Sequence, residues 1–125
     1  MEGVSGIAVA LGRALLGGLF VVGGIRHFFI LGVLTPIVAR RGVPFPRQAL
    51  ILASAFEVAA GGLLMLGVLV APAALGLILF TLVASCVMLN FWSLEGPERE
   101  MASNVWLSNI AIIGGLLIAF ARGGS

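Results

Sequence analysis

The chain alternates long apolar runs with short polar connections. A membrane-spanning helix needs roughly 20 mostly apolar residues, and four runs meet or approach that length: about 6–31, 48–70, 72–92 and 103–121. The second and third runs are joined by almost nothing, only residues 69–71, which predicts a tight antiparallel hairpin. The pattern therefore predicts an all-α membrane protein. We expect an antiparallel four-transmembrane-helix bundle that forms a single domain over residues 1–125.

The other two connections are longer and differ in character. Between the first and second runs, residues 33–41 could form a short helix at the membrane interface. Pro44 and Pro46 then interrupt helical structure. Between the third and fourth runs lies SLEGPEREMA, the only frankly polar stretch, which we interpret as a loop.

Composition supports a membrane protein. Hydrophobic residues make up 61% of the chain and charged residues 10%, whereas soluble domains carry about 25% charged residues. The net charge of +2 is too small to indicate a nucleic-acid partner. Cys86 is the only cysteine, so no disulfide can form within the chain, and we expect it to be a small buried hydrophobe.

Small residues recur at four-residue spacing in three of the runs. Such stripes let helix backbones approach closely in lipid, and we interpret them as packing within the bundle, with a homodimer face as the alternative. The stripes are Ala10, Ala14 and Gly18; Ala55 and Ala59; and Ala111, Gly115 and Ala119.

Glu57 is the only charged side chain between Gln48 and Pro72. A charge in hydrocarbon costs at least a few kcal/mol, so Glu57 needs a partner, a proton or water. The end of the first span, the start of the second, the end of the third and the start of the fourth share one side of the membrane, here called side B. The opposite side is side A.

Several polar side chains fall in the side B half of the predicted bundle. At about 1.5 Å per residue, Glu57 lies about 14 Å from side B, His27 and Asn109 about 8 Å, and Asn90 about 5 Å. Trp92 and Trp106 lie at the rim, as in an aromatic belt.

The face of the first span selects among its ionisable residues. At about 100° per residue, His27 lies on the same face as Arg13, whereas Arg26 points elsewhere and is placed to contact lipid phosphate. Arg13 is about 20 Å from His27 towards side A, and helix tilt decides whether it reaches Glu57. We predict a polar pocket of His27, Glu57, Asn109 and Arg13 that binds a small ligand or relays a proton. A structural ion pair that fixes helix register is the alternative.

No complete catalytic motif is present, and one His with one Glu does not make a metal site. Whether the chain is an enzyme is therefore left open, and no cofactor motif is evident. Arginines 40, 41, 47 and 99 lie in the side B connections. The positive-inside rule then puts side B in the cytoplasm and both termini outside, in a bacterial inner membrane.

Several segments together resemble the DoxX family of small four-helix membrane proteins: GRALLGGLFVVGGIRHFF, RRGVPFPRQ, FEVAAGGLLMLG, NFW and NIAIIGGLLI. The resemblance implies an antiparallel four-helix bundle with a short interfacial helix after the first span. It also implies that Arg13, His27, Glu57 and Asn109 match polar positions of the family. The chain departs from the pattern at Leu89, where many members have His, and at Ser108, where Lys is frequent.

Two functions are weighed on this basis. Because members of the family resemble a subunit of thiosulfate:quinone oxidoreductase, the first is a membrane subunit of a redox-linked complex that handles a quinone or a sulfur or thiol species. The second is a non-catalytic assembly factor or accessory subunit packed against a larger membrane complex. Both imply contact with lipid and either membrane-protein partners or a homo-oligomer. A small transporter is a third reading, which would require oligomers.

Overall fold

The computed structural model describes residues 2–88 and 94–123. These residues form five helices: α1 (Glu2–Phe29), α2 (Leu31–Arg40), α3 (Pro46–Leu66), α4 (Val70–Met88) and α5 (Gly96–Gly123). All except α2 are long and apolar enough to cross a membrane. The predicted all-α membrane bundle is confirmed, as is the short helix between the first two spans.

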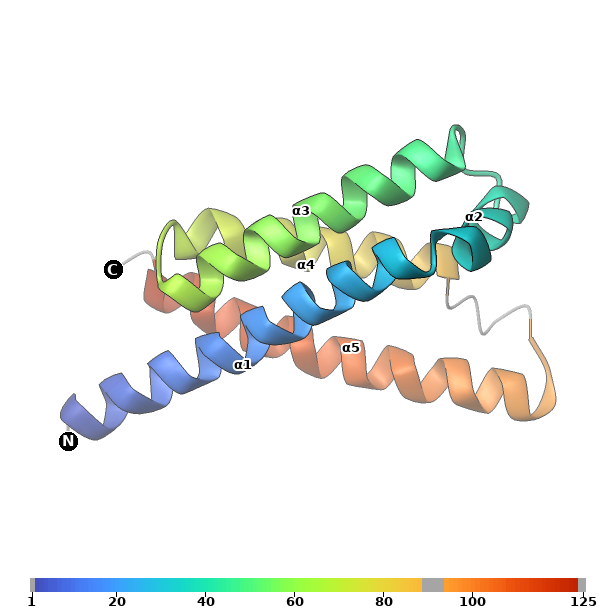
Figure 1. Cartoon of the computed structure of the whole chain (residues 1–125). Coiled ribbons are helices and arrows are strands. Elements are labelled where there is room, and N and C mark those ends of the chain that lie inside the picture. Colours follow the sequence, from blue (N-terminus) through green and yellow to red (C-terminus); the bar gives the residue numbers. More distant parts are fainter. Residues whose placement is uncertain (1, 89–93, 124–125) are drawn as a thin grey trace.

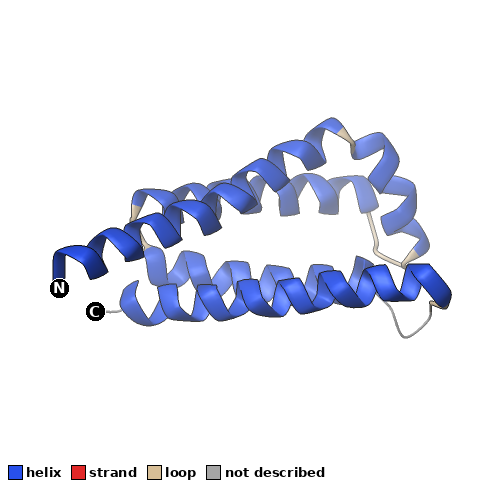
Figure 2. Ribbon diagram, turned by 90° about the horizontal axis from the view of Figure 1, so that it is seen from below, coloured by secondary structure: helices blue, strands red, loops and turns tan. Residues whose placement is uncertain are grey.

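The long helices pack as two pairs (Figure 1). Helix α1 runs along α3, and α4 runs along α5, while α3 also contacts α4. Figure 2 shows these pairs as two layers, with the start of α1 and the end of α5 at the same end of the bundle. That end is side A, and α2 lies at side B.

Glycines allow α1 and α3 to approach closely. A Cβ at Gly17 would overlap the carbonyl oxygen of Gly61, and a Cβ at Gly61 would lie 2.7 Å from the carbonyl oxygen of Gly17. Further along the seam, a Cβ at Gly24 would lie 2.9 Å from the carbonyl oxygen of Ser54. Only residues without side chains fit where two helix backbones meet in this way.

The predicted small-residue stripes are mostly not at these seams. Ala10, Ala55 and Ala59 are exposed on the outside of the bundle, and a Cβ at Gly18 would meet nothing within 4 Å. The expectation that the stripes pack within the bundle is therefore wrong for the first two. Cys86 is exposed as well, on an outward face of α4, rather than buried.

The turn between α3 and α4 comes earlier than residues 69–71. Gly67 has a φ of 74°, its N–H donates to the carbonyl of Leu64, and the N–H of Val68 donates to that of Leu63 at 3.0 Å. This is the Schellman ending, in which a left-handed residue closes the helix. Gly67 adopts that conformation without steric cost, so α3 stops although the apolar run continues.

Helix α5 begins at Gly96, seven residues before the apolar run at 103. Glu98, Arg99 and Glu100, expected in a loop, form its first turns. All three residues favour helix, because helix propensity does not depend on hydrophobicity. The start of the apolar run therefore marks where the chain enters the membrane rather than where the helix begins.

Candidate functional site

His27 and Glu57 are brought together from α1 and α3. The Nδ1 atom of His27 lies 3.2 Å from Oε2 of Glu57, and Glu57 is only 5% exposed. Gly23, one turn before His27, provides the space: a Cβ there would lie 2.8 Å from Oε1 of Glu57. The carboxylate thus rests against the bare backbone of α1.

The His27–Glu57 contact leaves hydrogen-bonding capacity unused. Although the 3.2 Å distance suits an ion pair, it lacks hydrogen-bond geometry, and Oε2 of Glu57 has no hydrogen-bond partner among the described residues. Ser54, three residues earlier on α3, is 1% exposed, and its hydroxyl also has no partner within that part of the chain. Buried polar groups are normally paired, so each unpaired one needs an explanation.

Ser54 and His27 both line a cavity of about 230 Å³ near side B, here called the His27 cavity. Its other walls are apolar side chains from α2, the connection after it, α3 and α4. They are Leu34, Val38, Val43, Ala49, Leu50, Ala53, Phe80, Val83, Ala84, Val87 and Met88. Glu57 is not part of the lining and reaches the cavity only through His27.

Asn109 belongs to the other helix pair. Its Nδ2 donates a hydrogen bond of 2.8 Å to Oγ of Ser85, which joins α5 to α4, and Ser85 is buried. Neither residue lines the His27 cavity. Asn109 is thus half-buried between α4 and α5, in a polar contact separate from that cavity.

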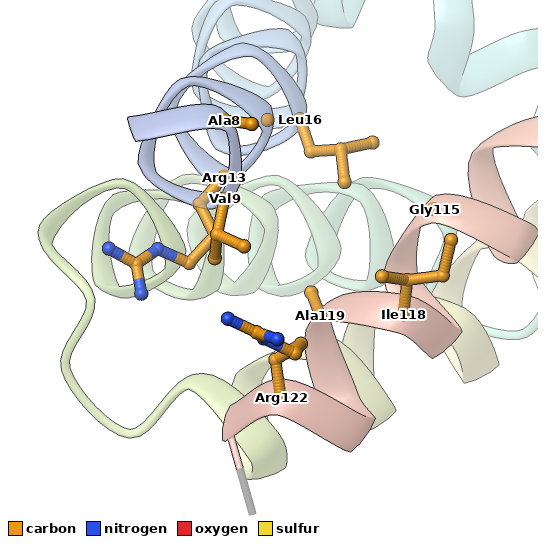
Figure 3. Close-up of a pocket in the computed structure, with 9 residues that line it drawn as sticks. Ala8, Val9, Arg13, Leu16, Gly115, Ile118, Ala119 and Arg122 are labelled. Carbon is orange, nitrogen blue, oxygen red and sulfur yellow. The ribbon is translucent and has the colours of Figure 1, made fainter. Parts of the chain in front are cut away.

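Arg13 lies at the opposite end of the bundle from His27 and Glu57. Its guanidinium group is beside Gly67, where a Cβ would lie 3.1 Å from one of its terminal nitrogens. Since Gly67 follows Glu57 by ten residues, the two are separated by about 15 Å along α3. Arg13 lines a second cavity, of about 290 Å³, between α1 and α5 (Figure 3).

The remaining predicted residues are at the periphery or outside the described residues. Arg26 is exposed, which fits a lipid-facing arginine, and Trp106 is half-buried on α5. Asn90 and Trp92 lie outside the described residues. A group of three or more His, Cys, Asp or Glu side chains that could hold a metal ion is not found in the part of the chain described.

Ser54 and Ser85 were missed by the sequence reasoning. Both are uncharged and lie in apolar runs, where a serine commonly bonds to the backbone of its own helix. A signal was available for Ser54, because it precedes Glu57 by three residues and shares its face of the helix.

These features define an integral membrane protein of four spanning helices with an ionisable pair beside an apolar cavity. The sequence profile of the DoxX family matches residues 8–90, more than half of the 125 residues. The chain therefore belongs to the DoxX family. The match includes His27 and Glu57 and stops before α5, which carries Asn109. Comparison with curated proteins and with solved structures returns no match.

Proposed function

We propose that this protein is a quinone-binding membrane subunit of a redox-linked complex, and that the quinone ring occupies the His27 cavity. The observation that carries the proposal is the pairing of polar groups in an otherwise apolar cavity. His27 and Ser54, whose hydroxyl has no partner among the described residues, line the same cavity. Glu57 contacts His27 from outside the cavity. Pockets of this kind, apolar with few polar groups, are typical of small-molecule sites.

The cavity fits a quinone headgroup in size and chemistry. An apolar cavity of about 150 Å³ is enough for benzene, so 230 Å³ can take a substituted ring. A quinone ring needs apolar walls and donors for its carbonyl oxygens. The side chains of Val83, Val87 and Leu50 supply such walls, and Ser54 supplies a hydroxyl donor.

His27 and Glu57 divide the work at the site. With Nδ1 3.2 Å from the Glu57 carboxylate, Nε2 is the ring nitrogen left for a ligand. A protonated imidazole donates from Nε2 to a carbonyl oxygen, and a neutral one accepts there from a hydroxyl. His27 can thus hold or release a proton at Nε2, while Glu57 orients the ring and stabilises its charge. The bound quinone would supply the electron-transfer chemistry, and a partner protein would exchange electrons with it.

Ser54→Ala is the sharpest test, and Ser85→Ala is its matched control. Both replace a buried serine, but only Ser54 lines the cavity. Loss of one hydrogen bond of about 0.5–1.5 kcal/mol should weaken binding of a short-chain benzoquinone roughly 2- to 13-fold in Ser54→Ala. The Ser85→Ala variant should bind as the wild type does, although it loses its bond with Asn109. Binding is measured by titration of the purified protein.

A second test of the proposal uses the Glu57→Gln variant. Native mass spectrometry of protein extracted gently from its own membranes should show a mass increment that matches a quinone. The increment should be reduced in Glu57→Gln, because the amide cannot balance a protonated His27. Unchanged quinone content in both Glu57→Gln and Ser54→Ala would refute the proposal.

A non-catalytic accessory subunit is the second candidate, and the outward small residues favour it. Ala55 and Ala59 are exposed on α3 and Ala10 on α1, where a partner helix could approach closely. This function predicts copurification with a larger membrane protein in fixed ratio, with no dependence on Glu57 beyond folding. A protein that remains monomeric and alone in native membranes would exclude it.

A bacterial inner membrane with both termini outside is the location we propose. The α2–α3 connection and its flanks contribute Arg40, Arg41 and Arg47 to side B, and Arg99 lies there near the start of α5. This excess supports side B as the cytoplasmic face.

A further inference from the structure

The second cavity lies between α1 and α5 at side A, far from His27, and has a different chemistry. It is lined by two arginines, Arg13 and Arg122, and otherwise by small or apolar residues; none of the lining residues is acidic. Figure 3 shows the guanidinium groups of both arginines at the same side of the cavity, Arg13 from α1 and Arg122 from α5. We call this the Arg13 cavity.

The Arg13 cavity lies at the depth of the lipid headgroups. Arg13 lies beside Gly67, in the turn where the chain leaves α3 to begin α4, and Arg122 is in the last turn of α5. Both arginines are therefore level with the side A ends of neighbouring spans. The part of α1 before Arg13 continues about 16 Å further, which agrees with a helix of 28 residues that exceeds the membrane core.

The buried part of Arg13 calls for a hydrogen-bond acceptor. Nε of Arg13 is buried and has no hydrogen-bond partner among the described residues. The guanidinium group of Arg122 lines the same cavity (Figure 3), so a ligand that accepts a hydrogen bond from Arg13 would meet a second positive group there.

We propose that the Arg13 cavity binds the phosphodiester headgroup of an anionic membrane phospholipid. Guanidinium groups match phosphate oxygens in charge and geometry, and basic pockets between membrane helices are suited to such headgroups. The apolar side chains of Leu16 and Ile118 continue from the arginines towards the membrane interior along α1 and α5, so an acyl chain finds an apolar wall beside its own headgroup. This wall distinguishes a lipid from a free phosphate, which has no use for it.

A variant that fills the cavity without touching either charge provides the cleanest test. Gly12 lines the cavity, and a Cβ there meets nothing within 4 Å, so Gly12→Leu adds a side chain in open space. Gly18→Leu is the matched control, since Gly18 is on the same helix, has equally open surroundings and lines neither cavity. The full-length protein is delipidated in detergent and titrated with phosphatidylglycerol, followed by native mass spectrometry.

We expect the wild type and Gly18→Leu to bind phosphatidylglycerol at least about tenfold more tightly than phosphatidylcholine with the same acyl chains, because only the former has net charge. Arg13→Gln should lose at least about tenfold in affinity, the effect of losing one charged hydrogen-bonded contact. Gly12→Leu should lose at least about as much, because its side chain occupies the space that the headgroup would fill. Their content of copurified quinone should be unchanged, because the His27 cavity is at the other end of the bundle.

Three outcomes would overturn the assignment. Equal affinity for the two lipids would show that the headgroup charge is not recognised. Wild-type affinity in Gly12→Leu would show that the lipid binds outside the Arg13 cavity. Displacement of phosphatidylglycerol by an equal concentration of inorganic phosphate would identify a site for free anions instead of lipid. If Arg13→Gln does not fold, Gly12→Leu still decides the matter, since it keeps both arginines.

Discussion

Gly23 is the residue on which the His27–Glu57 contact most directly depends. A methyl group at this position would lie 2.8 Å from Oε1 of Glu57, closer than atoms normally approach. Gly23→Ala should therefore push the carboxylate away from His27. Because the carboxylate is the end of a flexible side chain that can move aside, the loss of stability should stay below the range of about 1–3 kcal/mol that is typical of overpacking. Gly18→Ala, in open space on the same helix, should be neutral or stabilise by up to about 1 kcal/mol. Thermal unfolding in detergent measures both.

The displaced carboxylate also has a chemical signature. His27 is the only histidine in the chain, so its modification by diethylpyrocarbonate can be followed by the mass of the intact protein. Release from Glu57 should make His27 react faster in Gly23→Ala than in Gly18→Ala. Equal rates in the two variants would show that Gly23 does not govern the pair.

At this scale the sequence predicted the His27–Glu57 contact but not the whole pocket. Helical periodicity placed His27 inward and Arg26 outward, because rotation about a helix follows directly from residue spacing. Arg13 shares the helix face of His27 but lies at a different depth in the membrane. The depth of a residue depends on the tilt of α1 and on how far α1 extends beyond its neighbours. Neither quantity can be obtained from one helix alone.

The close packing of helix α1 against helix α3 can be tested at its glycines. Gly61 and Gly62 are adjacent on α3, yet only Gly61 faces α1, where a Cβ would lie 2.7 Å from a backbone oxygen. Since backbone cannot move aside as a side chain can, Gly61→Ala should separate the helices and lower stability by about 1–3 kcal/mol. Gly62→Ala should be neutral or slightly stabilising. A similar change in stability in both variants would mean that the close approach of α1 and α3 does not require glycine at position 61.

The helices themselves were predicted more successfully than their ends and faces. Apolar length identified all four spans, but α3 stops at Gly67 because of a backbone conformation, and α5 starts at Gly96 because polar residues also form helix. The small-residue stripes were assigned to the interior, whereas Ala55 and Ala59 face outward. A stripe shows that close approach is feasible for a helix face, without showing whether the neighbour belongs to the same chain.

For the whole molecule, the distribution of arginine around the bundle predicts its orientation. The structure places Arg13 and Arg122 towards side A. Arg40, Arg41, Arg47 and Arg99 remain at side B, together with exposed Arg26. The excess still favours side B as the cytoplasmic face, because the rule depends on the difference between the sides.

A topology measurement also bears on both proposed sites. Alkaline phosphatase, which becomes active only outside the cytoplasm, should be active when fused after Ser125 and inactive when fused after Gly42, between α2 and α3. The opposite result would invert the bundle. The His27 cavity would then open near the external face, so its redox partner would have to approach from outside, and the Arg13 cavity would draw its lipid from the cytoplasmic leaflet. Orientation therefore determines from which side a partner meets each site, even though the contacts within the sites stay the same.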